Sequence, residues 1–83
     1  MTMINVLFFA RVRELAGCSA LDIAAGYPDV NTLHQHLVAR DDRLALALEK
    51  EKLLVAVNQT LVPFSHPLND GDEVAFFPPV TGG

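Results

Sequence analysis

The stretch that decides the fold is LLVAVNQTLV, residues 53–62. Its first half is apolar and rich in valine, which predicts a buried strand over residues 53–57, and residues 60–62 predict the strand that returns beside it. Asn58 and Gln59 link the two strands as a two-residue hairpin turn. The chain is therefore expected to contain a β-sheet of which this hairpin is one part.

Three more segments carry the apolar patterns that are typical of strands. Residues 4–9 predict the first strand, and residues 20–23 predict a second strand close enough to pair with it in antiparallel fashion. The turn residues at 69–72 predict a tight hairpin turn, and residues 73–77 predict the last strand. Together with the first hairpin, these segments give a sheet of about five strands.

Helical spacing of apolar residues predicts a short helical turn at residues 11–16 and a helix from residue 32 to about residue 40. Asn31 is expected to cap the second of these at its N-terminus, and Asp41 or Asp42 is expected to cap a third helix. The order of elements predicts an α+β fold, in which a helical layer lies on one face of a single mixed sheet.

Composition limits the classes of protein and partner. A chain of 83 residues makes one small domain, and 51% hydrophobic residues with a mean hydropathy of +0.28 exclude intrinsic disorder for most of its length. Cys18, the single cysteine, excludes an intramolecular disulfide and a cysteine-based zinc site. Because the formal net charge is −4 and the basic residues are scattered, neither nucleic acid nor an anionic membrane surface is expected as a partner.

No motif points to catalysis by the chain alone, and no metal site is expected. His34 and His36 are two residues apart on a predicted helix, so they point in different directions and are expected on the surface. The longest apolar run, residues 6–10, is too short to span a bilayer, and no basic region precedes it. These features, with the single cysteine, predict a cytoplasmic location.

The segment PPVTGG, residues 78–83, follows the last predicted strand without a linker. Two prolines favour a stiff, extended start, and two glycines end the chain without side chains. The segment reaches at most about 20 Å from the folded body. We therefore expect residues 1–77 to form the domain and residues 78–83 to form an extended tail that presents the Gly83 carboxylate. The alternative is that this end simply frays.

An exposed apolar patch is expected beside the tail. Phe9 at the end of the first strand, Leu61 on the short return strand and Phe77 at the end of the last strand are its members. Helices of an 83-residue chain can scarcely cover both faces of the sheet. An apolar patch left open on a small domain usually marks a partner surface.

Three segments carry a resemblance to a known family. They are DGDEVAFFPPVTGG (residues 70–83), VLFFARVRELAG (residues 6–17) and VAVNQ (residues 55–59). The chain resembles the small, sulfur-carrying subunits of molybdopterin synthase over its whole length, and the C-terminal motif is highly specific. This resemblance implies a ubiquitin-like β-grasp fold, which agrees with the predicted order of elements.

The resemblance also implies a chemistry for the tail. An ATP-dependent adenylyltransferase of the ubiquitin-activating type would adenylate Gly83, and a sulfur donor would displace AMP to leave a thiocarboxylate. The tail would then enter a pocket of the large catalytic subunit and give its sulfur to cyclic pyranopterin monophosphate, in a heterotetramer of two small and two large subunits. The small subunit itself would bind no cofactor tightly. The residues expected to insert with Gly83 are Pro78, Pro79, Val80, Thr81 and Gly82.

Three alternatives remain open on the sequence. Sulfur carriers of thiamine biosynthesis share the fold and the terminal Gly-Gly, although they are shorter and lack the Phe-Phe-Pro-Pro approach. A ubiquitin-like modifier would use the same activated Gly83 to form isopeptide bonds with lysines. A plain β-grasp interaction module would have an inert tail, since a fold alone does not fix a function.

Overall fold

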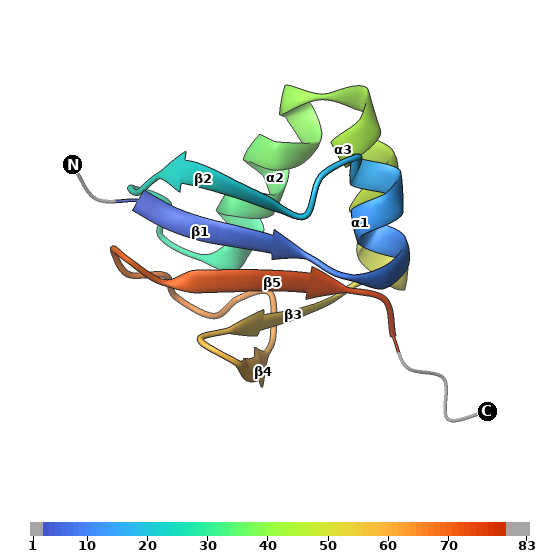
Figure 1. Cartoon of the computed structure of the whole chain (residues 1–83). Coiled ribbons are helices and arrows are strands. Elements are labelled where there is room, and N and C mark those ends of the chain that lie inside the picture. The colour runs from blue at the N-terminus through green and yellow to red at the C-terminus, as the bar shows by residue number, and fades with distance from the viewer. Residues whose placement is uncertain (1–2, 80–83) are drawn as a thin grey trace.

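A computed structural model describes residues 3–79 of the chain. It contains five strands, three α-helices and one 3₁₀ turn in the described residues (Figure 1). In chain order they are β1 (Met3–Phe8), α1 (Ala10–Ala16), β2 (Ala20–Ala24), α2 (Val30–Arg40), α3 (Asp42–Ala47), η1 (Lys50–Lys52), β3 (Leu54–Val57), β4 (Thr60–Val62) and β5 (Glu73–Phe77).

The five strands form one mixed sheet in the order β2-β1-β5-β3-β4. β1 and β5 pair in parallel, while the β1–β2, β3–β4 and β3–β5 pairs are antiparallel. The last strand of the chain therefore lies in the middle of the sheet. This is the ubiquitin-like β-grasp arrangement, and the α+β prediction with a five-stranded mixed sheet is confirmed.

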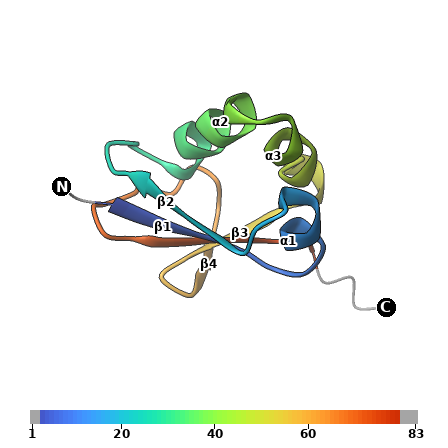
Figure 2. The ribbon, with the colours of Figure 1, turned by 45° about the horizontal axis from the view of Figure 1, so that its top comes forward.

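The helices lie on one face of this sheet and enclose the core with it (Figure 2). Phe8 of β1 and Phe76 of β5 are fully buried there, with stacked rings whose centroids are 6.3 Å apart. Leu33 and Leu37 of α2 are also fully buried, and they belong to the same cluster. Each large aliphatic or aromatic side chain buried in this way contributes roughly 1.5–3 kcal/mol relative to exposure.

The predicted hairpin turn is confirmed in detail. Asn58 and Gln59 both have positive φ, 51° and 69°, as a two-residue turn between strands requires. The Asn58 side chain also ties this turn to the start of β5, because Glu73 N donates to its Oδ1 at 3.1 Å and its Nδ2 donates to Asp72 Oδ1 at 3.0 Å. The turn is thereby anchored to the central strand.

The turn at 69–72 is tight, but the prediction that it closes a hairpin is wrong. Asp72 Oδ2 accepts from Asn69 N at 2.8 Å, as in a short turn. The segment before the turn, however, forms only an isolated bridge between Pro67 and Asp29 and is not a strand beside β5. β5 instead enters between β1 and β3, which are far from it in sequence.

Asp29, not Asn31, caps α2, and the helix begins two residues earlier than predicted. The Asp29 carboxylate accepts from Thr32 N at 2.8 Å and from the Thr32 hydroxyl at 2.7 Å. These hydrogen bonds stabilise the ionised form and lower the pKa of Asp29. The earlier start places Val30 in the helix, where it is fully buried. For α3, the cap is Asp41, one of the two predicted candidates.

His36 is exposed as expected, but the prediction that His34 lies on the surface is wrong. His34 shares the inner face of α2 with Leu33 and Leu37. Its Nε2 lies 2.6 Å from the Leu48 carbonyl oxygen, and because a carbonyl only accepts, Nε2 carries the proton and donates it. The histidine therefore joins α2 to the end of α3.

α1 ends at Gly17, which adopts a left-handed conformation with φ of 79° and donates its N–H to the Arg13 carbonyl at 3.0 Å. Glycine is favoured at such a cap because it has no Cβ. The Arg43 side chain of α3 lies against this position, and an added Cβ would be 2.7 Å from its Nη1. That atom is the free end of an exposed side chain, so the backbone conformation is the stronger constraint.

We predict that Gly17→Ala lowers the free energy of unfolding by about 1–2 kcal/mol, because the left-handed conformation costs an L-residue that much. Urea denaturation measures the change. Gly17→Asn should cost less, since asparagine tolerates this conformation. The cost of Gly17→Ala should persist in an Arg43→Ala background, and its disappearance there would show that the contact with Arg43 is the real constraint.

Candidate functional site

The chain leaves the sheet from its middle strand. β5 pairs with β1 on one side and β3 on the other, and Phe77 leads directly to Pro78 and Pro79 (Figure 1). Pro78 is half-buried and Pro79 is exposed. Val80, Thr81, Gly82 and Gly83, which belong to the predicted insertion segment, lie outside the residues that the structure describes.

The three predicted interface residues, Phe9, Leu61 and Phe77, share the face of the sheet that carries no helices; we call them the sheet-face patch. Phe9 is 48% exposed and Leu61 is 64% exposed, while Phe77 is half-buried. In β5, Phe77 alternates with Phe76, which points into the core. The patch therefore lies beside the point where the tail begins.

Strand register explains why these residues gather. Phe8 pairs with Phe76 in the parallel β1–β5 ladder, so Phe9 follows beside Phe77. Its N–H donates to the Phe76 carbonyl at 3.2 Å. On the other side, Leu61 pairs with Ala56, which in turn pairs with Ala75 of β5. Because Ala56 and Ala75 are small, no large side chain stands between Leu61 and β5 along this row, and β4 and β5 are about two strand spacings, or 10 Å, apart.

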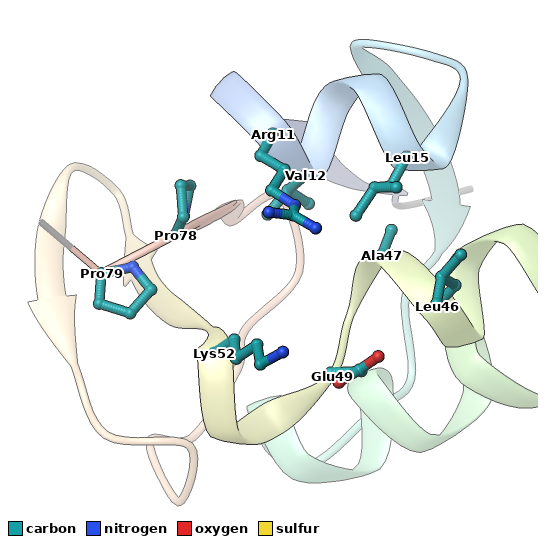
Figure 3. A pocket seen from close by; sticks show the side chains of 9 residues that line it. All are labelled: Arg11, Val12, Leu15, Leu46, Ala47, Glu49, Lys52, Pro78 and Pro79. Atoms are coloured by element: carbon teal, nitrogen blue, oxygen red, sulfur yellow. The ribbon is translucent and has the colours of Figure 1, made fainter.

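On the opposite side of the tail's root lies a groove, which we call the helix-side groove (Figure 3). Its cavity volume is about 360 Å³. Val12 and Leu15 of α1 face Leu46 and Ala47 of α3 across it, and the two prolines that follow β5 line its other end. The groove thus has mainly apolar walls.

Charged side chains stand at the rim of the helix-side groove. They are Arg11 on α1, Glu49 just after α3, and Lys52 at the end of η1, and all three are exposed. The Arg11 guanidinium points into the groove (Figure 3). Two cations and one anion therefore surround the apolar walls.

Between residues 3 and 79, no three His, Cys, Asp or Glu side chains come close enough together to hold a metal ion. Cys18 is a half-buried free thiol, and His34 is committed to the Leu48 carbonyl. None of the helices described is long and apolar enough to cross a membrane. The described residues therefore form two apolar surfaces, the sheet-face patch and the helix-side groove, which lie on opposite sides of the chain where it leaves β5.

Sequence reasoning found the sheet-face patch but missed the helix-side groove. One signal was present: Leu44 and Leu48 form the inward stripe at helical spacing, and Leu46 lies off that stripe. It is 57% exposed in the structure. The proline wall of the groove had no such signal, because it depends on where β5 lies in the sheet.

The sequence matches one protein family and several known proteins along nearly its whole length. The model of the ThiS family matches residues 6–83. The molybdopterin synthase sulfur carrier subunit of Escherichia coli (strain K12) is 69% identical over 98% of this chain and 100% of its own length. The protein of the same description from Haemophilus influenzae is 53% identical with the same coverage.

Among solved structures, the complex of subunits 1 and 2 of the molybdopterin-converting factor from Helicobacter pylori contains a similar chain. It matches with a TM-score of 0.67 and 28% identity, covering 98% of this chain and 99% of that one. Because the family model and the relatives match along nearly the whole sequence, the chain belongs to the ThiS family and, within it, to the molybdopterin synthase sulfur carrier subunits.

Proposed function

We propose that this chain carries sulfur to molybdopterin synthase as a thiocarboxylate on Gly83. The observation that carries the proposal is the 69% identity to the Escherichia coli sulfur carrier subunit over that subunit's whole length. The match of the family model also runs to Gly83, so the Gly-Gly end lies within the similar region. A cytoplasmic location is part of the proposal, supported by a composition with a single cysteine.

The chemistry explains why the end must be activated. A carboxylate is a poor acyl electrophile, because its charge repels nucleophiles and oxide is a bad leaving group. In the proposed sequence, the Gly83 carboxylate attacks ATP on a ubiquitin-activating-like adenylyltransferase and becomes an acyl adenylate with loss of pyrophosphate. A sulfur donor then displaces AMP. The resulting thiocarboxylate is ionised and polarizable, and therefore nucleophilic without a neighbouring base.

The acceptor in this proposal is cyclic pyranopterin monophosphate, held by the large subunit. The Helicobacter pylori complex of subunits 1 and 2 supports a large-subunit partner. Two sulfur atoms are needed for each dithiolene, and each tail brings one. This supports a heterotetramer in which two carriers serve two large subunits. In it, the partner supplies substrate binding and acid–base groups, while this chain supplies the nucleophile.

Docking and sulfur delivery are assigned to different parts of the chain. Glycine adds no side-chain contact area, so the last residues contribute little apolar binding energy. The sheet-face patch supplies an exposed apolar surface next to the tail. We therefore assign docking to Phe9, Leu61 and Phe77, and insertion to the segment from Pro78 to Gly83.

We predict that the intact protein from its native host contains a population in which sulfur replaces one terminal oxygen of Gly83. High-resolution mass spectrometry of the undigested chain measures this. A variant without Gly82 and Gly83 is the control and should show no such population. Covalent adducts with other proteins would instead indicate the modifier, co-purification with a thiamine-pathway partner would indicate that carrier, and an unmodified chain would indicate an inert tail.

We also predict that tail length is strict. Adding one residue after Gly83, or deleting Gly83, shifts the reacting atom by about 3.3 Å. A misplacement of about 1 Å already costs on the order of 100-fold in rate, so sulfur transfer should be abolished. A single-turnover assay with the purified large subunit and the thiocarboxylate forms measures it. Unchanged melting temperatures would show that the fold is intact, while normal turnover by either variant would contradict the mechanism.

Finally, Leu61→Ala and Phe77→Ala should weaken binding to the large subunit by roughly tenfold or more each, as expected for apolar anchors of an interface. Titration calorimetry measures the affinity. Leu61 is 64% exposed, so its loss should barely change the melting temperature. Met3→Ala is the matched control, because Met3 is an exposed apolar residue of β1 at the end far from the tail. Equal affinities for all three variants would reject the patch.

A further inference from the structure

The helix-side groove is an apolar surface that the proposed function leaves unassigned. Leu46 is one of the few large apolar side chains that the described residues expose, and Val12 and Ala47 beside it are buried. The groove volume of about 360 Å³ lies at the lower end of the range of small binding pockets, about 300–1,000 Å³. It therefore has room for an apolar side chain and the backbone that carries it.

The rim of the groove favours an anionic partner. Arg11 and Lys52 supply two cations against the one anion of Glu49, although the whole chain has a formal net charge of −4. Arg11 points into the groove (Figure 3). A guanidinium in that position offers a forked donor to a carboxylate. The complementary surface is therefore an apolar side chain with an acidic residue next to it.

We propose that the helix-side groove receives such a segment, apolar with an adjoining carboxylate, from the large subunit of molybdopterin synthase. The proposal rests on the proposed function, because it needs the partner that takes up the tail. The apolar side chain lies between α1 and α3 against Leu46. The carboxylate pairs with Arg11, with Lys52 close by on the same rim.

The length of the tail supports this occupant. Residues 80–83, fully extended, span at most about 14 Å. A partner cavity that encloses them must therefore open directly next to Pro79. Since Pro79 and Pro78 line the groove, partner residues at the mouth of that cavity lie next to the groove.

A contact in the groove would also fix the orientation of the domain, which a contact through the sheet-face patch alone does not. The patch lies on the face of the sheet without helices, and the groove lies on the helical side of the same strand end (Figures 1 and 3). One contact alone leaves the domain free to tilt about the end of β5. Two contacts on opposite sides fix the direction in which the tail enters, which a reaction sensitive to about 1 Å requires.

The test compares two matched pairs of full-length variants. Leu46→Glu and Arg11→Glu alter the groove, and Ala39→Glu and Arg40→Glu make the same charge changes at exposed positions of α2 outside it. All four positions are exposed, so the melting temperatures should stay close to that of the wild type. Binding to the purified large subunit is measured by calorimetry at low and high salt.

We expect Leu46→Glu and Arg11→Glu each to weaken binding by roughly tenfold or more, and both controls to bind like the wild type. Arg11→Glu should also reduce the salt dependence of the affinity, because a rim ion pair is lost. If the wild type binds but both groove variants bind equally well, the groove inference is wrong and the proposed function stands.

Other outcomes identify other occupants and also overturn the inference. Tighter binding by the groove variants would mean that residues 80–83 of the free chain occupy the groove and must leave it before docking. A monomer produced by Leu46→Glu from a wild-type dimer would mean that a second copy of this chain occupies it. If the wild type itself does not bind the large subunit, the proposed function fails together with the inference.

Discussion

The pairing of β5 between β1 and β3 is the constraint on which the rest of the structure depends. Val74 and Phe76 are fully buried by it, and the strand has hydrogen-bonded neighbours on both sides. Because β1 runs parallel to β5, both strands end at the same edge of the sheet. That edge therefore holds Phe9, the start of α1 and the root of the tail together. A chain end leaving an edge strand would have no such surroundings.

Several of these features were predictable from the sequence, because each depends on residues that are close together along the chain. The hairpin over residues 53–62 and the last strand at 73–77 follow from short runs whose residue types suit only one structure, and both were found. Asn58 and Gln59 adopt the positive φ values that their turn demands. The sheet-face patch followed as well, since strand alternation decides which side chains share a face.

What the sequence did not predict depends on distant neighbours. Asn31 was expected to cap α2, but Asp29, two residues earlier, suits an N-cap equally by residue type, and the burial of Val30 favours the earlier start. His34 is polar by type, but the Leu48 carbonyl gives it a buried partner that lies 14 residues away. The helix-side groove combines α1 with prolines more than 60 residues later in the chain. No local sequence pattern predicts that two segments so far apart in the chain will line the same groove.

The same geometry explains how a small domain can separate recognition from chemistry. In the proposed function, the reacting group sits on glycines, which add no side-chain surface, so binding strength must come from the folded body. In these proposals, surfaces on both sides of the β5 end bind the partner and aim the tail without touching the reacting atom. Affinity and reactivity are then set by different residues. In the proposed function, the carrier is activated on one protein and gives up its sulfur on another, so it must bind and leave each of them. With this division, substitutions in the docking surfaces can adjust both affinities without altering the acyl group on which both partners act.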